Sequence, residues 1–148
     1  MRLILLLLFI PLSTLAQEES SMISCDCLKD AETQLDLNFC SKDCADASDS
    51  TMNELYERIL NHYQQELNSM YVAKAPVDEE RMEYVESMVE TIKTSQEEFL
   101  SYRKSSMKIY SHMFEGGSIR PLVVNLCFFD ITVQRIHTLT DLWDSIDN

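Results

Sequence analysis

Three long stretches of the chain carry apolar residues at three- and four-residue steps, and this period constrains the fold more than any other feature. The stretches cover about 38–71, 78–113 and 118–146. Apolar residues at such steps lie on one face of an α-helix, so each stretch predicts a long amphipathic helix. The 148 residues include only 2 Gly and 3 Pro, which leaves little material for the turns of a sheet. The sequence therefore predicts an all-α fold.

Short links separate the three predicted helices. Pro76 interrupts the chain after the first helix, and Asp78 is a suitable N-cap for the second. Gly116 and Gly117 end the second helix, and Ser118 is expected to cap the third. Long helices joined by short links become antiparallel neighbours. We expect an antiparallel up-down bundle of three long helices with a disulfide-stapled N-terminal segment.

Each predicted helix has one face that should be buried. On the first helix this face comprises Met52, Leu55, Tyr56, Ile59, Leu60, Tyr63 and Leu67, extended backwards by Cys40, Cys44, Ala47 and Thr51. On the second it comprises Met82, Val85, Met88, Val89, Ile92, Phe99, Tyr102, Ile109 and Met113. On the third it comprises Val124, Phe128, Ile131, Arg135, Leu139, Leu142 and Ile146. The first helix begins at Asn38 or Ser41 on this pattern, or at Thr51, where Glu54 would complete a capping box.

The first residues have the layout of a secretory signal peptide. Arg2 precedes the unbroken apolar run 3–10, Pro11 ends the run, and small residues precede a cut after Ala16. The alternative, a membrane anchor, needs about 20 apolar residues, roughly twice this run. We expect a periplasmic or secreted protein without stable membrane insertion after cleavage. The expected organisation is a signal peptide at 1–16, a short exposed segment at 17–24 and a single helical domain at 25–148.

Four of the five cysteines form the pattern C-x-C-x12-C-x3-C. Cys40 and Cys44 are separated by about 6 Å of helical rise, and Cys25 and Cys27 by about 6.6 Å of extended chain. Nested bridges, Cys25–Cys44 and Cys27–Cys40, fit antiparallel segments better than the crossed pairing does. A four-thiolate zinc site is the alternative, although its usual signature is a pair of C-x2–4-C knuckles. Cys127 is then left as a free, buried thiol.

The charge and the motifs exclude several function classes. The chain has 25 acidic and 12 basic residues and a formal charge of -13, so it repels nucleic acid and should prefer a basic partner. His62, His112 and His137 each precede an acidic residue by three or four positions, a spacing typical of surface pairs on helices. No catalytic or metal-binding motif is found. We expect no enzymatic activity, no metal and no cofactor.

A series of short motifs runs along the chain: Thr33-Gln34-Leu35 with Asn38 and Cys40, then Met52 to Tyr56, Phe99 to Arg103, Glu115 to Ile119, and Cys127 with Thr132 and Arg135. Together they resemble the lysozyme inhibitor LprI-like N-terminal domain family of small exported bacterial proteins. Their order matches that family over about Cys25 to Leu142. The resemblance implies a helical fold and a role in binding and inhibiting lysozyme.

This chain departs from the family pattern at two places. Members usually carry a cysteine shortly after the Tyr-Arg motif, which the resemblance implies is bridged to the one matching Cys127, and Met107 occupies that position here. In exchange, Cys25 and Cys44 are an additional pair. Phe99 replaces the usual Trp, a milder change. A second N-terminal bridge offsets part of the lost one, at about 2–4 kcal/mol for a native disulfide.

Lysozymes are commonly basic, so the acidity of this chain agrees with the implied partner. Many exported proteins are acidic, however, and two alternatives stay open. One is a non-enzymatic structural or adaptor protein of the envelope that binds another protein. The other is a helical bundle that binds a small ligand, which requires a cavity.

The predicted contact residues lie on the turn before the third helix. Glu115, Gly116, Gly117 and Ser118 form a turn that could enter the cleft of a glycosidase, where Ser118 would bond a catalytic carboxylate. Helix capping also explains Gly116, Gly117 and Ser118, as a helix stop followed by a helix cap, and it is the favoured interpretation. Tyr102 and Arg103 are further candidates, although Arg103 has the alternative of pairing with an acid on a neighbouring helix. The acidic segment 17–51, with 2 basic and 9 acidic residues, is a rival contact surface.

Overall fold

The computed structural model describes residues 24–73 and 78–147, and they form an all-helical structure with no strand. Its elements are the short 3-10 helix η1 (Asp26–Lys29) and the α-helices α1 (Gln34–Val72), α2 (Glu79–Met113) and α3 (Arg120–Asp147). The predicted all-α class and the three long helices are confirmed. The predicted signal peptide lies outside the described residues.

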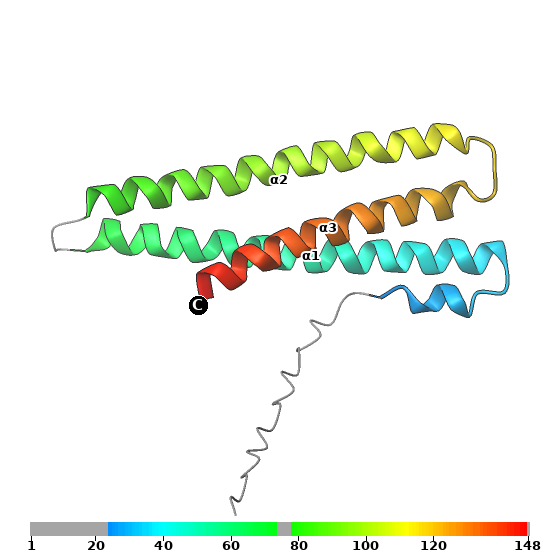
Figure 1. Ribbon diagram of the computed structural model, residues 1–148, viewed down its shortest axis with the longest axis horizontal. Helices are drawn as coiled ribbons and strands as arrows, with labels where there is room; N and C mark the ends of the chain where they lie inside the picture. Colours follow the sequence, from blue (N-terminus) through cyan, green and yellow to red (C-terminus); the bar gives the residue numbers. More distant parts are fainter. Residues whose placement is uncertain (1–23, 74–77, 148) are drawn as a thin grey trace, which may run out of the picture.

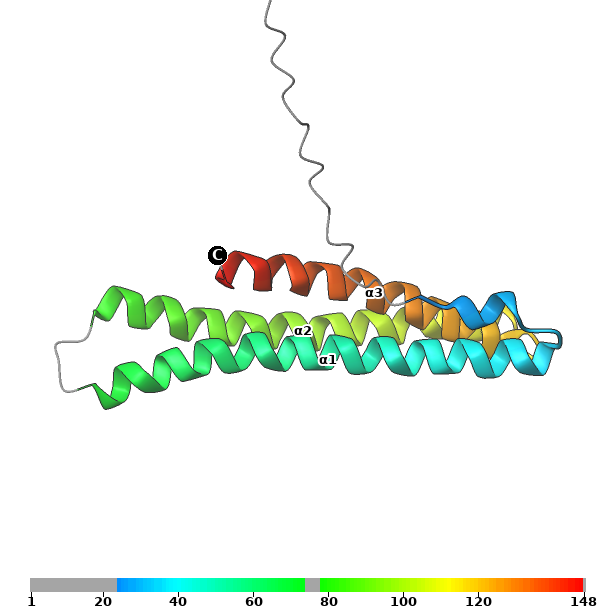
Figure 2. The same cartoon turned by 90° about the horizontal axis from the view of Figure 1, so that it is seen from below.

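The three helices form an up-down bundle. α1 and α2 make a long antiparallel hairpin, and α3 lies across one face of it, packing most extensively on α1 (Figures 1 and 2). In both views the hairpin extends past the C-terminal end of α3. η1, the start of α1 and the α2–α3 turn all lie at the opposite end, which we call the turn end. Within the described ranges, none of the helices combines the length and apolarity that crossing a membrane requires.

α1 begins earlier than its apolar pattern predicts. Thr33 is the N-cap: its hydroxyl accepts from the Asp36 amide at 3.2 Å, and the Asp36 carboxylate accepts from the Thr33 amide at 2.9 Å. This reciprocal capping box starts the helix at Gln34, so the predicted starts at Asn38, Ser41 and Thr51 are wrong. Thr51 lies inside the helix, where its hydroxyl donates to the carbonyl of Ala47.

The ends of α2 follow the prediction, and the start of α3 does not. Asp78 caps α2 by accepting from the Arg81 amide at 3.0 Å, and Gly116 has the expected left-handed φ of 78°. α3 begins at Arg120. The backbone amide of Val123 donates to the carbonyl of Ile119 at 3.1 Å, which is the first helical hydrogen bond of α3. The residue before the helix is thus Ile119, so the prediction that Ser118 caps α3 is wrong.

The apolar core occupies the middle of the bundle and the α1–α2 hairpin. Its buried members are Met52, Ile59, Leu60, Tyr63, Val85, Val89, Ile92 and Leu139. On α2 the buried positions continue towards the turn end at Gln96 and Arg103, seven residues after Val89 and fourteen after it. A seven-residue repeat is the seam of a coiled-coil-like packing. The apolar residues predicted to continue this face, Tyr102, Ile109 and Met113, are instead 61%, 61% and 69% exposed.

A similar correction applies to the first turns of α1. Ala47, predicted to be buried, is exposed, whereas Ser41, Ala45 and Ser48 are buried. The small side chains let α3 approach α1 closely, and the buried hydroxyls of Ser41 and Ser48 donate to carbonyls one turn back. Because Ser41 and Ser48 are polar, the apolar pattern of the sequence did not predict that they are buried.

Candidate binding surface at the turn end of the bundle

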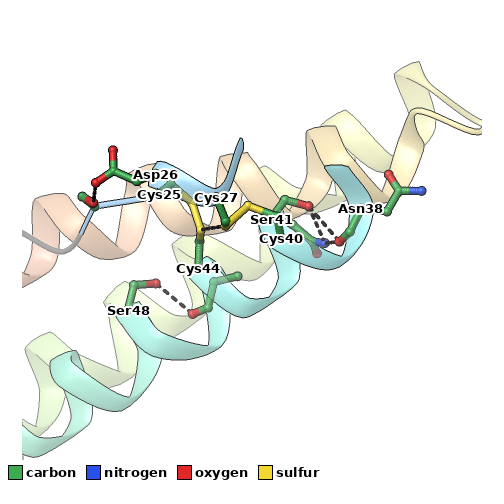
Figure 3. Close-up of a disulfide and its surroundings, with 11 residues drawn as sticks. Cys25, Asp26, Cys27, Asn38, Cys40, Ser41, Cys44 and Ser48 are labelled. Carbon is green, nitrogen blue, oxygen red and sulfur yellow. Dashed lines mark hydrogen bonds between the residues drawn. A yellow bond between two sulfur atoms is a disulfide. The ribbon is translucent and has the colours of Figure 1, made fainter. Parts of the chain in front are cut away.

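Two nested disulfides fasten η1 to the first turns of α1. They join Cys25 to Cys44 and Cys27 to Cys40, with Cα–Cα distances of 5.7 and 5.8 Å (Figure 3). The predicted pairing is confirmed. Sulfurs joined in disulfides are not thiolate ligands, so the bridges account for the cysteine cluster in place of the zinc alternative. The N-terminal segment is thereby held against the side of α1.

Cys127 is the remaining cysteine, and it is free and buried, as predicted. Its pKa is raised above the ordinary thiol value, first by desolvation and then by the negative charge of Asp130. A thiol that resists ionisation is a weak nucleophile. Cys127 therefore serves as a small apolar side chain between the helices.

A set of amide contacts ties the α2–α3 turn to α1. The side-chain amide of Asn38 donates to the carbonyl of Ser118 at 3.3 Å. The side-chain amide of Asn125, in α3, donates to the carbonyl of Asn38 at 3.4 Å and to the hydroxyl of Ser41 at 3.1 Å. Figure 3 shows Asn38 and Ser41 one turn apart beside the disulfides. The turn and the stapled segment are thus parts of one connected end of the bundle.

The turn itself is exposed to solvent. Glu115, Gly116, Gly117 and Ser118 are all exposed. A Cβ at Gly116 would meet no atom within 4 Å, but its φ of 78° disfavours any other residue. Gly117 has no such φ, and a Cβ there would make an ordinary contact of 3.4 Å with the Phe114 carbonyl. The Ser118 hydroxyl bonds to none of the described residues. Capping therefore explains Gly116 but not Ser118.

The structure places Arg103 inside the bundle, where it joins the three helices. One guanidinium nitrogen donates to the Asp49 carboxylate of α1 at 2.7 Å and to the Thr132 hydroxyl of α3 at 3.0 Å. The guanidinium also lies over the ring of Phe128, 4.0 Å from its centroid. The side chain is only 10% exposed. The alternative weighed for Arg103, pairing with an acid on a neighbouring helix, is what the geometry shows.

A second arginine completes this polar layer. Arg103 and Arg135 each have the guanidinium carbon 5.4 Å from the centroid of the Phe99 ring. Arg135 donates from Nε to the side-chain carbonyl of Gln96 at 3.2 Å, and Gln96 donates to the sulfur of Met52 at 3.6 Å. Desolvation lowers the pKa of Arg135, which nevertheless remains charged because a guanidinium starts so high. Arg103 of the Tyr-Arg motif thus joins Thr132 and Arg135 of the Thr-x2-Arg motif in one interhelical network.

Sequence reasoning missed the partners of these arginines. Asp49 and Gln96 lie among many polar residues, and nothing in their local sequence marks them. The one usable signal was spacing, because Gln96 and Arg103 continue the seven-residue repeat that starts at Val89. Asn38 belonged to a recognised motif, but its contact with the turn 80 residues away is a tertiary feature.

Tyr102 is accessible, unlike Arg103. Tyr102, Ile109 and Met113 are spaced by seven and four residues, so they share one face of α2, and each is more than 60% exposed. We call these three residues the apolar strip. It extends along about 16 Å of helix and ends beside the turn. Exposed apolar side chains gathered on one face make the apolar strip a candidate interaction surface.

The described part of the acidic segment lies at the same end. Three of its acids are committed to ion pairs, because Asp26 pairs with Lys29, Asp46 with Lys42 and Asp49 with Arg103. Asp36 is engaged in the cap of α1, and its hydrogen bonds from Thr33 lower its pKa. The exposed acids of the described part that take part in neither an ion pair nor the cap are Asp30, Glu32 and Asp43. The sequence offered the turn and the acidic segment as alternative contact surfaces. In the structure the two lie at the same end of the bundle.

Comparison with known proteins identifies a family for this chain. The family model described as lysozyme inhibitor LprI matches residues 25–139. A protein of Rhizobium meliloti, described as uncharacterized, is 28% identical over 126 residues, which span 83% of this chain and 82% of the relative. No solved structure matches. The match covers the stapled segment, all of α1 and α2, and α3 up to Leu139, so the chain belongs to the lysozyme inhibitor LprI family.

Proposed function

We propose that this protein is an exported, non-enzymatic inhibitor of lysozyme, with the turn end of the bundle as its contact surface. The proposal takes residues 1–16 as a signal peptide and 25–148 as a single inhibitory domain acting in the periplasm or outside the cell. Membership in the lysozyme inhibitor family supports the class of partner. The observation that carries the choice of surface is the exposed turn, whose Ser118 hydroxyl has no bond to any described residue.

The turn is suited to entering a narrow cleft. Gly116 and Gly117 present no side chains, so the backbone can approach a partner closely. Glycosidases such as lysozyme cleave their substrates with two carboxyl groups. The Ser118 hydroxyl can donate to such a carboxylate, and the contact of Asn38 with the Ser118 carbonyl holds the turn in place before binding. Preorganisation of this kind reduces the entropy lost on association.

The neighbouring surfaces extend the contact. A formal charge of -13 attracts a basic lysozyme at long range, and Asp30, Glu32 and Asp43 add local negative charge beside the turn. Tyr102 contributes through the apolar strip, where an aromatic side chain supplies contact area at low entropic cost. Arg103 acts indirectly in this proposal, because its bonds to Asp49 and Thr132 hold the helices that carry the turn.

The central experiment measures residual lysis of bacterial cell walls by lysozyme mixed with the purified mature protein. We expect inhibition at near-stoichiometric amounts. Ser118→Ala removes only the unbonded hydroxyl, and Gly117→Ala adds a methyl group at a position that accommodates it. Both should weaken inhibition about tenfold, whereas Gly116→Ala is less informative because it also strains the backbone. The matched control is Ser87→Ala, an exposed serine of α2 far from the turn, which should inhibit like the original protein.

A second set of variants separates the turn from the acidic surface. Asp30→Asn, Glu32→Gln and Asp43→Asn are combined in one protein, and Glu79→Gln, Glu83→Gln and Glu90→Gln are combined in a control with the same change of charge. Loss only with the first set assigns part of the attraction to the turn end. Binding should weaken as the Debye length falls from about 10 Å at 0.1 M salt to about 3 Å at 1 M.

Absence of inhibition against every class of lysozyme would overturn the proposal. The envelope adaptor, which binds a different protein through the same surface, would then be the better interpretation. Equal loss of inhibition with both acidic sets, and none with Ser118→Ala or Gly117→Ala, would retain the inhibitor and reject cleft entry by the turn.

A further inference from the structure

A groove of about 390 Å³ lies between α2 and α3, within the range of small-molecule sites. Its walls are apolar and come from both helices: Leu100 and Met107 of α2 face Val124 and Phe128 of α3. Arg103 and Ser111 also line it, but Arg103 is bound to Asp49, and the Ser111 hydroxyl accepts from Arg120. Between the two helices the walls thus offer a polar chain little beyond the hydroxyl hydrogen of Ser111.

Two lysines form one edge of the groove. Lys104 and Lys108 are exposed and lie one helical turn apart on α2. Neither forms an ion pair with any described residue, and like charges at this spacing repel each other. The chain has only 12 basic residues against 25 acidic ones, so two adjacent, unpaired cations beside an apolar groove are a local reversal of its charge.

This arrangement does not suit the partner of the proposed inhibitor. A basic lysozyme would be repelled by Lys104 and Lys108. An acidic peptide would match the charge, but its backbone amides and carbonyls would lie against Leu100, Met107 and Val124 without hydrogen-bond partners. A ligand with a plain hydrocarbon tail and one anionic head matches both the walls and the edge.

We propose that the α2–α3 groove binds a fatty-acid carboxylate. The hydrocarbon chain lies between Met107 and Val124, and the carboxylate bonds Lys104 and Lys108 at the edge of the groove. No covalent step is involved. The site is distinct from the turn, so the binding of a fatty acid and the inhibition of lysozyme are separable properties of the same chain.

The test is calorimetric titration of the mature protein with laurate below its critical micelle concentration. We expect saturable binding of one laurate per chain. Hexanoate keeps the carboxylate but shortens the tail, and dodecyltrimethylammonium keeps the tail but reverses the charge. Both should bind at least about tenfold more weakly than laurate, because each lacks one of the two matching features.

Two variants locate the site. Lys104→Gln with Lys108→Gln should weaken laurate binding about tenfold, the sum expected for two partly exposed ion pairs. The matched control, Lys29→Gln with Lys93→Gln, carries the same change of charge and should change the affinity less than twofold. Met107→Trp fills the groove and should abolish binding, with helix content checked by circular dichroism.

Four results would overturn the proposal. The first is no saturable binding of laurate by the folded protein. The second is equal affinity for laurate and dodecyltrimethylammonium, which indicates non-specific apolar binding. The third is unchanged affinity in the Met107→Trp variant, which places the ligand elsewhere. Binding of a Glu- and Leu-rich peptide more tightly than laurate would also reject the fatty acid as occupant.

Discussion

The two halves of the bundle are held together by different kinds of interaction. We call the part formed by residues 52–72, 79–92 and 136–147 the hairpin half, and the part formed by residues 24–49 and 96–135 the turn half. In the hairpin half the helices meet through apolar side chains, among them Met52, Ile59, Val85 and Leu139, which are at most 2% exposed. In the turn half the buried residues are small, polar or bridged: Cys40, Ser41, Cys44, Ala45, Ser48, Gln96, Arg103, Cys127 and Thr132. Every buried side-chain nitrogen and oxygen in the described residues has a hydrogen-bond partner.

This difference explains which half of the bundle can hold a binding surface in one fixed geometry. Burial of apolar area stabilises without fixing direction, so an apolar interface tolerates small shifts of one helix against another. Disulfides and buried hydrogen bonds have narrow geometries, so they fix the helices of the turn half in one arrangement. The turn, which depends on Asn38 and Asn125 for its attachment, belongs to the half that is built this way.

The largest expected effect comes from breaking the polar layer. Arg103→Met leaves the Asp49 carboxylate and the Thr132 hydroxyl without their donor, and we expect a loss of about 3 kcal/mol in the free energy of unfolding. Arg81→Met is the matched control in the hairpin half, where the Arg81 side chain is 46% exposed in its pair with Glu66. It should cost less than about 1 kcal/mol. Urea unfolding followed by circular dichroism measures both, and equal losses would contradict the division into two halves.

The next largest loss of stability is expected on removal of a disulfide. Cys25→Ala with Cys44→Ala removes the outer bridge and leaves Cys27–Cys40 in place. We expect a loss of about 2 kcal/mol, at the low end for a native disulfide because the inner bridge still restricts most of the same loop. Helix content should be unchanged, and inhibition of lysozyme should fall with the ordering of the turn end. A variant as stable as the original protein would show that the outer bridge contributes little.

A smaller effect is expected in the apolar core. Ile59→Val deletes one methylene from a fully buried side chain and should cost about 1 kcal/mol in thermal or urea unfolding. Inhibition of lysozyme should stay unchanged, since no bond of the turn half depends on Ile59. If Ile59→Val weakened inhibition as much as Ser118→Ala does, the two halves would be energetically coupled, and the turn would not depend on the turn half alone.

The smallest effect is expected at Cys127, and it is measured as the reactivity of the thiol rather than as stability. Intact-mass alkylation of the unfolded, unreduced protein should find one free thiol per chain. In the folded protein the reaction should be slow at neutral pH and should accelerate only above the ordinary thiol range, because a raised pKa keeps the thiol protonated. Rapid alkylation of the folded protein at neutral pH would show that the turn half opens readily.

The hairpin half was the more predictable from sequence. There the buried positions are apolar, so the three- and four-residue period finds them, and Asp78 marks the start of α2 by its own local cap. The disulfide pairing was predictable too, because helical and extended spacings restrict which sulfurs can meet. These features depend on residues close together in the chain.

The turn half was predictable as a set of motifs but not as a structure. Following apolar residues along α2 led to Tyr102, Ile109 and Met113, which are exposed, and away from Gln96 and Arg103, which are buried. Burying an arginine is favourable only when other helices supply its partners, and that information is not local. The start of α1 was missed for a different reason, since its cap at Thr33 precedes the apolar pattern by several residues.

Hydrogen exchange of the protein with and without lysozyme locates the contact surface without altering any residue. We expect slower exchange on binding in the turn, in the apolar strip and in the first turns of α1, at about 34–46 and 102–119. We expect no change in the hairpin half, at about 60–72 and 79–92. Protection confined to the hairpin half, with the turn unaffected, would contradict the claim that the turn end binds lysozyme.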